Sequence, residues 1–172
     1  MAVVFEEVAA SERELHVVGM GEMAVTASPN VVLSCIGLGS CVAVCAYDNQ
    51  SKIGGMAHIV LPLNHGLPGN NPAKFADTAV PLLISEMIKK GSVKNQLIIK
   101  IAGGAQMTLA PGLRDTFKTG ERNLAQILLV LQRENIAIAA ADTGGSVGRT
   151  VKMYIRTGQI TIKTAHGVPQ EL

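Results

Sequence analysis

The sequence is poor in aromatic residues and in charge. Only 3% of its 172 residues are aromatic, tryptophan is absent, and charged residues make up 16%. Surfaces that bind single-stranded nucleic acid stack bases on aromatic side chains, and they carry basic clusters that attract phosphates. With a net charge of +2 and no basic run longer than Lys89-Lys90, the chain shows neither pattern. The scarcity of aromatics also predicts a core of aliphatic residues and methionine.

Long hydrophobic runs are missing as well. Apolar stretches such as 127–131 and 136–141 fall far short of the roughly 20 residues that cross a bilayer. The N-terminus is acidic and has no basic segment followed by an apolar one, so we expect no secretory signal. Three cysteines form an odd set in a chain for which we expect no export signal. Free thiols in a cytoplasmic protein are the simplest interpretation.

What the chain does contain is enough apolar material for one domain. Hydrophobic residues make up 48% of the sequence, and a chain of this length can bury a sizeable core. We expect a loosely ordered N-terminal arm at residues 1–14 and a single domain at 15–172. Apolar, β-branched runs predict strands at 15–18, 23–26, 31–35, 41–47, 53–61, 97–102, 136–141, 151–155 and 159–164.

Two helices are predicted among these strands. The first starts after Asn71, a capping residue followed by proline, and ends at Gly91. Pro81 lies inside it and should kink or divide it. The second spans 121–134. Strands that outnumber helices in this way predict an α+β domain, with helices covering one side of stacked sheet.

Cys41 stands where a glycine-bearing turn meets an apolar run. Free cysteine is among the most buried residue types, so a structural thiol is one interpretation. The other is a nucleophile, because N–H groups of the Gly39-Ser40-Cys41 turn can point at one spot and stabilise a thiolate and then an oxyanion. Cys45 lies four residues further into the same predicted strand without a glycine turn beside it, and it fits the structural interpretation better.

His58 stands in a similar setting, in a predicted strand of small and aliphatic residues. A lone histidine there is usually satisfied within the core. As a base it would take the thiol proton and return it to a leaving amine. If the predicted strands 41–47 and 53–61 form a hairpin, Cys41 and His58 lie on neighbouring strands and supply the parts of a thiol hydrolase.

Other chemistries have weaker signals. Cys35, Cys41, Cys45 and His58 are four potential zinc ligands, but the C-x5-C-x3-C spacing lacks the tight C-x2-C knuckle, so we expect no metal. The glycine-rich segment 144–149 lacks the Walker spacing and its lysine, and it precedes a predicted strand. We interpret it as a turn and expect no cofactor.

Five segments together resemble the CheD family of bacterial chemotaxis. They are 38–44 (LGSCVAV), 55–62 (GMAHIVLP), 100–107 (KIAGGAQM), 120–123 (GERN) and 144–149 (GGSVGR). No single segment is decisive. The five in this order, within a match from Gly19 to Thr164, are specific.

The resemblance implies a three-layer α/β/β fold, similar to the catalytic domain of cytotoxic necrotizing factor toxins. It implies a protein-glutamine glutaminase, an amidohydrolase with Cys41 as nucleophile and His58 as base. The implied substrates are Gln side chains on the cytoplasmic helical region of methyl-accepting chemotaxis receptors, with glutamyl methyl esters hydrolysed by some members. The CheC phosphatase is a further implied partner. Nothing in the resemblance implies nucleic-acid binding or membrane insertion.

One position departs from the family pattern. The family usually has threonine six residues before its cysteine, hydrogen-bonded to the catalytic histidine, and here that position is Cys35. A thiol is a much weaker hydrogen-bonding group than a hydroxyl. Ser34 is adjacent, but strand alternation points it to the other face. The candidates for the orienting group are therefore Cys35, Ser34 and a backbone carbonyl.

Two other functions stay open from the sequence. In the first, the domain docks receptors or a CheC-like phosphatase and catalysis is weak, with Cys35 as the sign of decay. In the second, the chain is an unrelated thiol enzyme that hydrolyses small amides. Conversion of receptor Gln residues separates the deamidase from the docking module, and turnover of free glutamine would indicate the small-amide enzyme.

Overall fold

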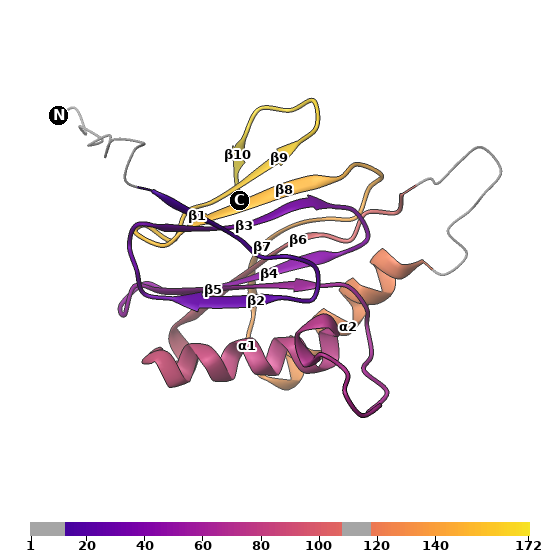
Figure 1. The fold of residues 1–172 in the computed structure, drawn as a ribbon, viewed down its shortest axis with the longest axis horizontal. Helices are drawn as coiled ribbons and strands as arrows, with labels where there is room; N and C mark the ends of the chain where they lie inside the picture. The colour runs from indigo at the N-terminus through magenta and orange to yellow at the C-terminus, as the bar shows by residue number, and fades with distance from the viewer. Residues whose placement is uncertain (1–12, 108–117) are drawn as a thin grey trace.

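The computed structural model describes residues 13–107 and 118–172, and these form three layers: two stacked sheets and a helical layer (Figure 1). Sheet A has the order β1 (Glu14–Val17), β3 (Val31–Leu38), β8 (Arg149–Tyr154), β9 (Ile160–Thr164) and β10 (Gln170–Glu171). Sheet B has the order β2 (Met23–Thr26), β5 (Ile53–Ile59), β4 (Val42–Asp48), β6 (Leu97–Gly103) and β7 (Ile138–Thr143). The predicted three-layer α/β/β fold is thereby confirmed.

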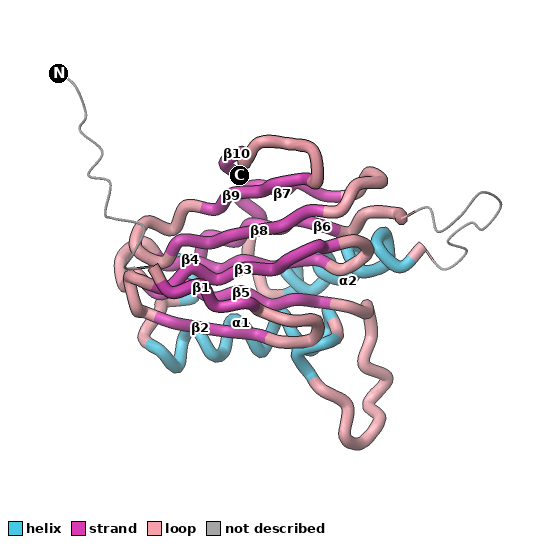
Figure 2. Tube along the Cα trace, turned by 45° about the horizontal axis from the view of Figure 1, so that its top comes forward, coloured by secondary structure: helices cyan, strands magenta, loops and turns pink. Residues whose placement is uncertain are grey.

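Both helices, α1 (Ala76–Lys90) and α2 (Thr119–Arg133), cover the face of sheet B that is turned away from sheet A (Figure 2). Neighbouring strands are antiparallel except for the parallel pairs β1–β3 and β6–β7. Two short 3-10 turns, Pro72–Lys74 and Lys94–Gln96, flank α1. No helix in the described ranges is long and apolar enough to span a membrane.

Strand β4 is the centre of the molecule, because both of its faces are buried. Val42 and its alternate neighbours pack against the helices, whereas Ala43 and Cys45 face sheet A. A strand buried on both faces reads as a continuous apolar run rather than as an alternating one. This explains the uninterrupted hydrophobic pattern at 42–47. The predicted hairpin of this strand with the next is confirmed, since β4 and β5 pair along their whole length.

The structure corrects the predicted first helix in two ways. Asn71 does accept a capping hydrogen bond from the Ala73 N–H, but it caps the 3-10 turn, and α1 begins at Ala76. Pro81 does not divide the helix, which runs without interruption to Lys90. Buried side chains on either side of the proline hold both halves of α1 on sheet B, and this packing outweighs the one hydrogen bond that proline removes.

Most of the predicted N-terminal arm, residues 1–12, lies outside the described residues. Within the rest of it, Glu14 already belongs to β1 and pairs with Val31. The strands on either side of Cys41 belong to different sheets, β3 to sheet A and β4 to sheet B. The residues between Leu38 and Val42 therefore cross from one sheet to the other.

Candidate active site

Cys41 occupies the crossover between the two sheets, immediately before β4. Its side chain lies in the apolar layer between the sheets, on the same face as Ala43 and Cys45, and the residue is 9% exposed. Burial raises the pKa of the Cys41 thiol, because the thiolate loses hydration there. The thiol is therefore protonated at neutral pH, and nucleophilic chemistry at this sulfur requires a base.

His58 lies on β5 directly opposite Ala43, so its side chain also faces sheet A. The residue is 3% exposed, and its Nδ1 is 3.0 Å from the carbonyl oxygen of Val18. A carbonyl oxygen only accepts, so Nδ1 carries the proton in this hydrogen bond. In the neutral ring, Nε2 then presents its lone pair. This buried nitrogen has no hydrogen-bond partner among the described residues.

The strand register places the thiol and the imidazole on one face. Ala43 pairs with His58 and Val42 pairs with Ile59, so Cys41, two residues before Ala43, is a diagonal neighbour of His58. Diagonal neighbours on one face of an antiparallel pair lie about 7–8 Å apart, within reach of long side chains. The register thus places the two predicted site residues on one face of neighbouring strands, but among the described residues no hydrogen bond joins the Cys41 thiol to Nε2 of His58.

Neither of the two side chains considered as orienting groups is hydrogen-bonded to His58. Cys35 faces the inter-sheet layer, is fully buried, and its Sγ lies 3.4 Å from the Sδ of Met56. Burial raises the pKa of Cys35, with the neighbouring thiols adding to the effect. Ser34 lies on the opposite face of β3, where it lines a hollow on the outer side of sheet A. The group bonded to His58 is the Val18 carbonyl, the third candidate.

The Cys41 turn is held by the end of strand β6. The Gly104 N–H donates to the Cys41 carbonyl at 2.8 Å, and the Ala105 N–H donates to the Gly39 carbonyl at 2.8 Å. Gly103 has φ +113°, and a Cβ there would collide with the Cys41 carbonyl oxygen. Only glycine lets the two backbones approach so closely.

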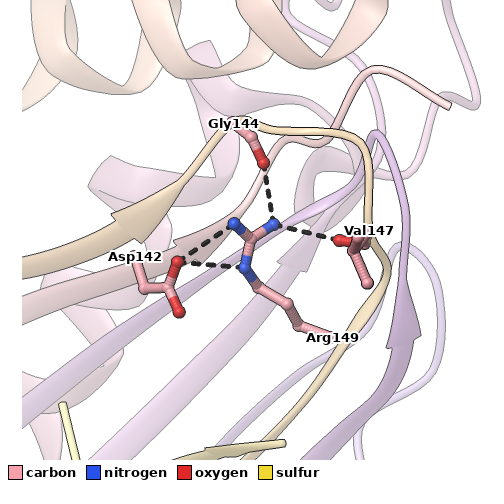
Figure 3. A network of polar contacts seen from close by, with 4 residues as sticks. All are labelled: Asp142, Gly144, Val147 and Arg149. Carbon is pink, nitrogen blue, oxygen red and sulfur yellow. Dashed lines mark hydrogen bonds and ion pairs between the residues drawn. The ribbon is translucent and has the colours of Figure 1, made fainter. Parts of the chain in front are cut away.

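The connection between β7 and β8 also crosses from one sheet to the other, and it lies next to the connection that carries Cys41 (Figure 3). Arg149, 8% exposed, forms an ion pair with Asp142 at 3.0 Å and donates to the carbonyls of Gly144 and Val147. The turn that it closes joins β7 in sheet B to β8 in sheet A. The sequence predicted this turn. It is joined to the Cys41 region by a hydrogen bond from the Gly144 N–H to the carbonyl of Gly103 at 2.9 Å.

Asn123 of α2 reaches the same region from the helical layer. It is fully buried, and its Nδ2 donates to the carbonyls of Ser40 at 3.0 Å and Val60 at 2.9 Å. Neither Asn123 nor the Val18 carbonyl was predicted as part of the site. The GERN segment contains Asn123, but nothing in that segment indicates a contact with Ser40 or Val60. A backbone carbonyl is present in every residue, so no residue type could have pointed to Val18.

Within the described ranges, no group of three or more His, Cys, Asp and Glu side chains is arranged to hold a metal ion. Cys45 is buried in the inter-sheet layer and burial raises its pKa to about 12. The chemistry that the geometry offers is therefore that of one thiol, one imidazole and a turn of backbone N–H groups.

Comparison with known proteins identifies the family. The model of the family described as CheD chemotactic sensory transduction matches residues 60–164. The chain belongs to the CheD family. A CheD from Desulfitobacterium hafniense (strain DSM 10664 / DCB-2) is 44% identical over 151 residues, which cover 87% of this chain and 94% of that protein. One from Caldanaerobacter subterraneus subsp. tengcongensis is 44% identical over 159 residues, covering 91% and 98%.

Both CheD relatives carry the name "Probable chemoreceptor glutamine deamidase CheD". The family match begins after Cys41 and His58, so it identifies the family without assigning a role to either residue. Among solved structures, the C-terminal domain of CNFy from Yersinia pseudotuberculosis matches with a TM-score of 0.44 and 9% identity, over 95% of this chain and 64% of that chain. This value is too low to support a statement about chemistry.

Proposed function

We propose that this CheD protein is a chemoreceptor glutamine deamidase that converts Gln side chains of methyl-accepting chemotaxis proteins to Glu. The single observation that carries the proposal is the shared strand face of Cys41 and His58, with the Nε2 of His58 unpartnered among the described residues. The names of the relatives supply the substrate class. Family resemblance adds CheC as a partner, which stays a prediction.

In the acylation half of the reaction, His58 acts as base and then as acid. Its Nε2 takes the Cys41 thiol proton while Sγ attacks the carboxamide carbon of the substrate Gln, forming the C–S bond. The carbonyl electrons move onto oxygen, where the Cys41 N–H is positioned to stabilise the oxyanion. His58 then returns the proton to nitrogen, the C–N bond breaks, and ammonia leaves a thioester.

Deacylation uses the same two residues. Water attacks the thioester carbon as Nε2 of His58 accepts one of its protons. The C–S bond breaks, the Cys41 thiol is restored with the proton from His58, and the substrate leaves with a Glu side chain. The net reaction adds one water and releases one ammonia, so it needs no cofactor. The Val18 carbonyl holds the ring in the tautomer that both halves require.

The test is peptide mass spectrometry of a receptor cytoplasmic fragment after incubation with the protein. Wild type is expected to convert discrete Gln residues to Glu, a gain of about one mass unit per site by the exchange of NH₂ for OH. Cys41→Ala and His58→Ala are each expected to lower turnover by more than about a thousandfold, while His65→Ala, in the exposed loop before α1, keeps wild-type turnover. Activity that persists in either site variant would refute the assignment.

The same experiment distinguishes the docking module. If wild type binds the fragment and converts no Gln, the protein docks receptors without catalysis. Turnover of free glutamine in place of receptor Gln would indicate the small-amide hydrolase.

A further inference from the structure

The carboxamide of Asn123 has one orientation. Its Nδ2 lies 3.0 Å from the Ser40 carbonyl oxygen and 2.9 Å from the Val60 carbonyl oxygen. A flipped amide would direct Oδ1 at these two acceptors, which cannot donate, so the nitrogen must face them. Both N–H groups of one amide are therefore used on main-chain carbonyls. Oδ1 is buried and has no partner in the described part of the chain.

These two carbonyls lie just beyond the end of a ladder. The β4–β5 pairing stops at Val42 and Ile59. Ser40 lies in the segment before β4 and Val60 in the segment after β5, both beyond that last pair. The Asn123 amide bridges their carbonyls where the β4–β5 ladder has no further hydrogen bonds. It therefore joins the segment next to the thiol to the segment next to the imidazole.

The acceptor oxygen of Ser40 belongs to a peptide unit with a second function. The Ser40 carbonyl and the Cys41 N–H are the two ends of one planar trans peptide, in which C=O and N–H point in opposite directions. A donor that fixes the oxygen therefore fixes the direction of the N–H. Accepting a hydrogen bond also polarises the unit and strengthens its N–H as a donor. Within the described ranges, no backbone carbonyl accepts a hydrogen bond from the Cys41 N–H.

The helix that carries Asn123 packs closely against the segment after β6. A Cβ at Gly120 would lie 2.5 Å from the Gly104 carbonyl oxygen, so the first turn of α2 contacts the Gly104 backbone directly. Gly104 in turn donates to the Cys41 carbonyl. The position of Asn123 relative to the Cys41 turn is thus fixed by contact between backbones rather than by a flexible side chain.

We propose that Asn123 is a positioning residue for the oxyanion: by donating to the Ser40 and Val60 carbonyls, it orients the Cys41 N–H toward the oxygen of the tetrahedral intermediate. The inference rests on the proposed deamidase function. An oxyanion donor acts only when charge develops on the substrate oxygen. Loss of Asn123 is therefore expected to lower kcat and to leave KM nearly unchanged.

Two reactions of the same thiol separate this role from general support of the fold. Deamidation passes through an oxyanion, whereas alkylation of Cys41 by iodoacetamide displaces iodide at a saturated carbon and forms none. In Asn123→Ala and Asn123→Asp, we expect kcat for a receptor fragment to fall by about 10- to 100-fold. Removal of an oxyanion donor costs on the order of 10²–10³, and here the donor is misdirected rather than removed. In Asn123→Ala, which introduces no charge, the rate of Cys41 alkylation and its pH dependence are expected to match wild type. Asn123→Asp keeps the size of the side chain and replaces the donor by an acceptor.

Asn95→Ala, at an exposed asparagine in the 3-10 turn after α1, is the matched control and should keep wild-type values. If Asn123→Ala folds incompletely, kcat is divided by the fraction of molecules in which peptide mapping finds Cys41 alkylated and Cys45 protected. Parallel loss of deamidation and alkylation would overturn the inference, since Asn123 would then support only the fold or the thiol. If wild type converts Gln and Asn123→Ala does so with unchanged kcat, the role of Asn123 is overturned while the deamidase function stands. A wild type that converts no Gln would overturn the proposed function together with the inference.

Discussion

At the scale of single residues, the orientation of His58 depends on one backbone atom. The Val18 carbonyl accepts from Nδ1, and the sulfur of Cys35, one of the two side-chain candidates, lies against that of Met56. A thiol at this position therefore removes no hydrogen bond from the histidine in this protein. The position that departs from the family pattern, Cys35, therefore takes no part in orienting His58 in this structure.

We accordingly predict that Cys35→Ala retains catalysis. The expected change in kcat is less than about fivefold, which corresponds to about 1 kcal/mol of transition-state stabilisation. Because the substitution empties a small volume in a packed layer, the free energy of unfolding should fall by about 1–2 kcal/mol. Steady-state deamidation and urea unfolding measure the two effects, with Cys41→Ala as the inactive reference.

A loss of kcat in Cys35→Ala as large as that in His58→Ala would show that the thiol orients the imidazole. The ¹⁵N chemical shifts of His58 provide an independent check. The proton is expected on Nδ1 in both wild type and Cys35→Ala, because the Val18 carbonyl is present in both.

At the scale of elements, the β4–β5 turn is fixed by a buried carboxylate. Asp48 is fully buried at the end of β4, and it accepts from the N–H groups of Gln50 at 2.9 Å and Ser51 at 3.3 Å. Its other oxygen accepts from the Val93 N–H at 3.2 Å. The turn is thereby tied to the segment that follows α1. Burial alone would raise the pKa of Asp48, but these donors outweigh it and hold the pKa below its ordinary value.

We predict that Asp48→Ala lowers the free energy of unfolding by about 2–3 kcal/mol at pH 7, because charge-assisted hydrogen bonds are lost and buried N–H groups stay unpaired. A lowered folded-state pKa adds stability above the unfolded pKa of about 3.9, and this stability is lost as pH falls through the folded pKa. The gap between wild type and Asp48→Ala should therefore narrow below about pH 4.

Urea unfolding of both proteins between pH 7 and pH 3 measures this gap. Glu86→Ala removes an exposed ion pair with Lys89 and should change stability by less than about 1 kcal/mol at any pH. A gap that stays constant with pH would show that the Asp48 carboxylate is not the stabilising form.

At the scale of the whole molecule, the site lies where the chain passes between the sheets. The β3–β4 connection carries Cys41, and the β7–β8 connection carries the Arg149 network (Figure 3). Both are hydrogen-bonded to the residues after Gly103. The three thiols consequently share one layer, with Cys41 at its edge and Cys45 inside it.

This arrangement predicts the order in which the thiols react. In the native protein, iodoacetamide should label Cys41 first, whereas Cys35 and Cys45 should react only at the rate of global unfolding. Burial raises the pKa of Cys45 to about 12, which further suppresses its thiolate. Peptide mapping over a time course measures the three rates, and labelling in denaturant provides the reference. Native labelling of Cys45 as fast as that of Cys41 would mean that the two sheets separate readily.

Much of this architecture followed from local patterns. The hairpin of β4 and β5 was predictable because two β-branched apolar runs flank a short polar turn, and it put Cys41 and His58 on neighbouring strands. Their shared face follows only from the register that the structure shows. The buried face of α1 followed from apolar residues that recur at helical spacing, at 76, 80, 83, 84 and 87. The start of α1 did not, because Asn71 caps a 3-10 turn and gives the same local signal as a helix cap.

The sequence by itself therefore predicted the two helices and the described strands other than β10, and it singled out Cys41 and His58 as candidates for chemistry, because each of these predictions depends on spacing within a few consecutive residues. Only the tertiary structure decided that β3 and β4 belong to different sheets, since several apolar strands compete as partners and only packing of the whole layer selects among them. It likewise decided that the Val18 carbonyl orients His58 and that Asn123 contacts the Cys41 turn. Those contacts join residues 40 or more positions apart, and no local pattern encodes them.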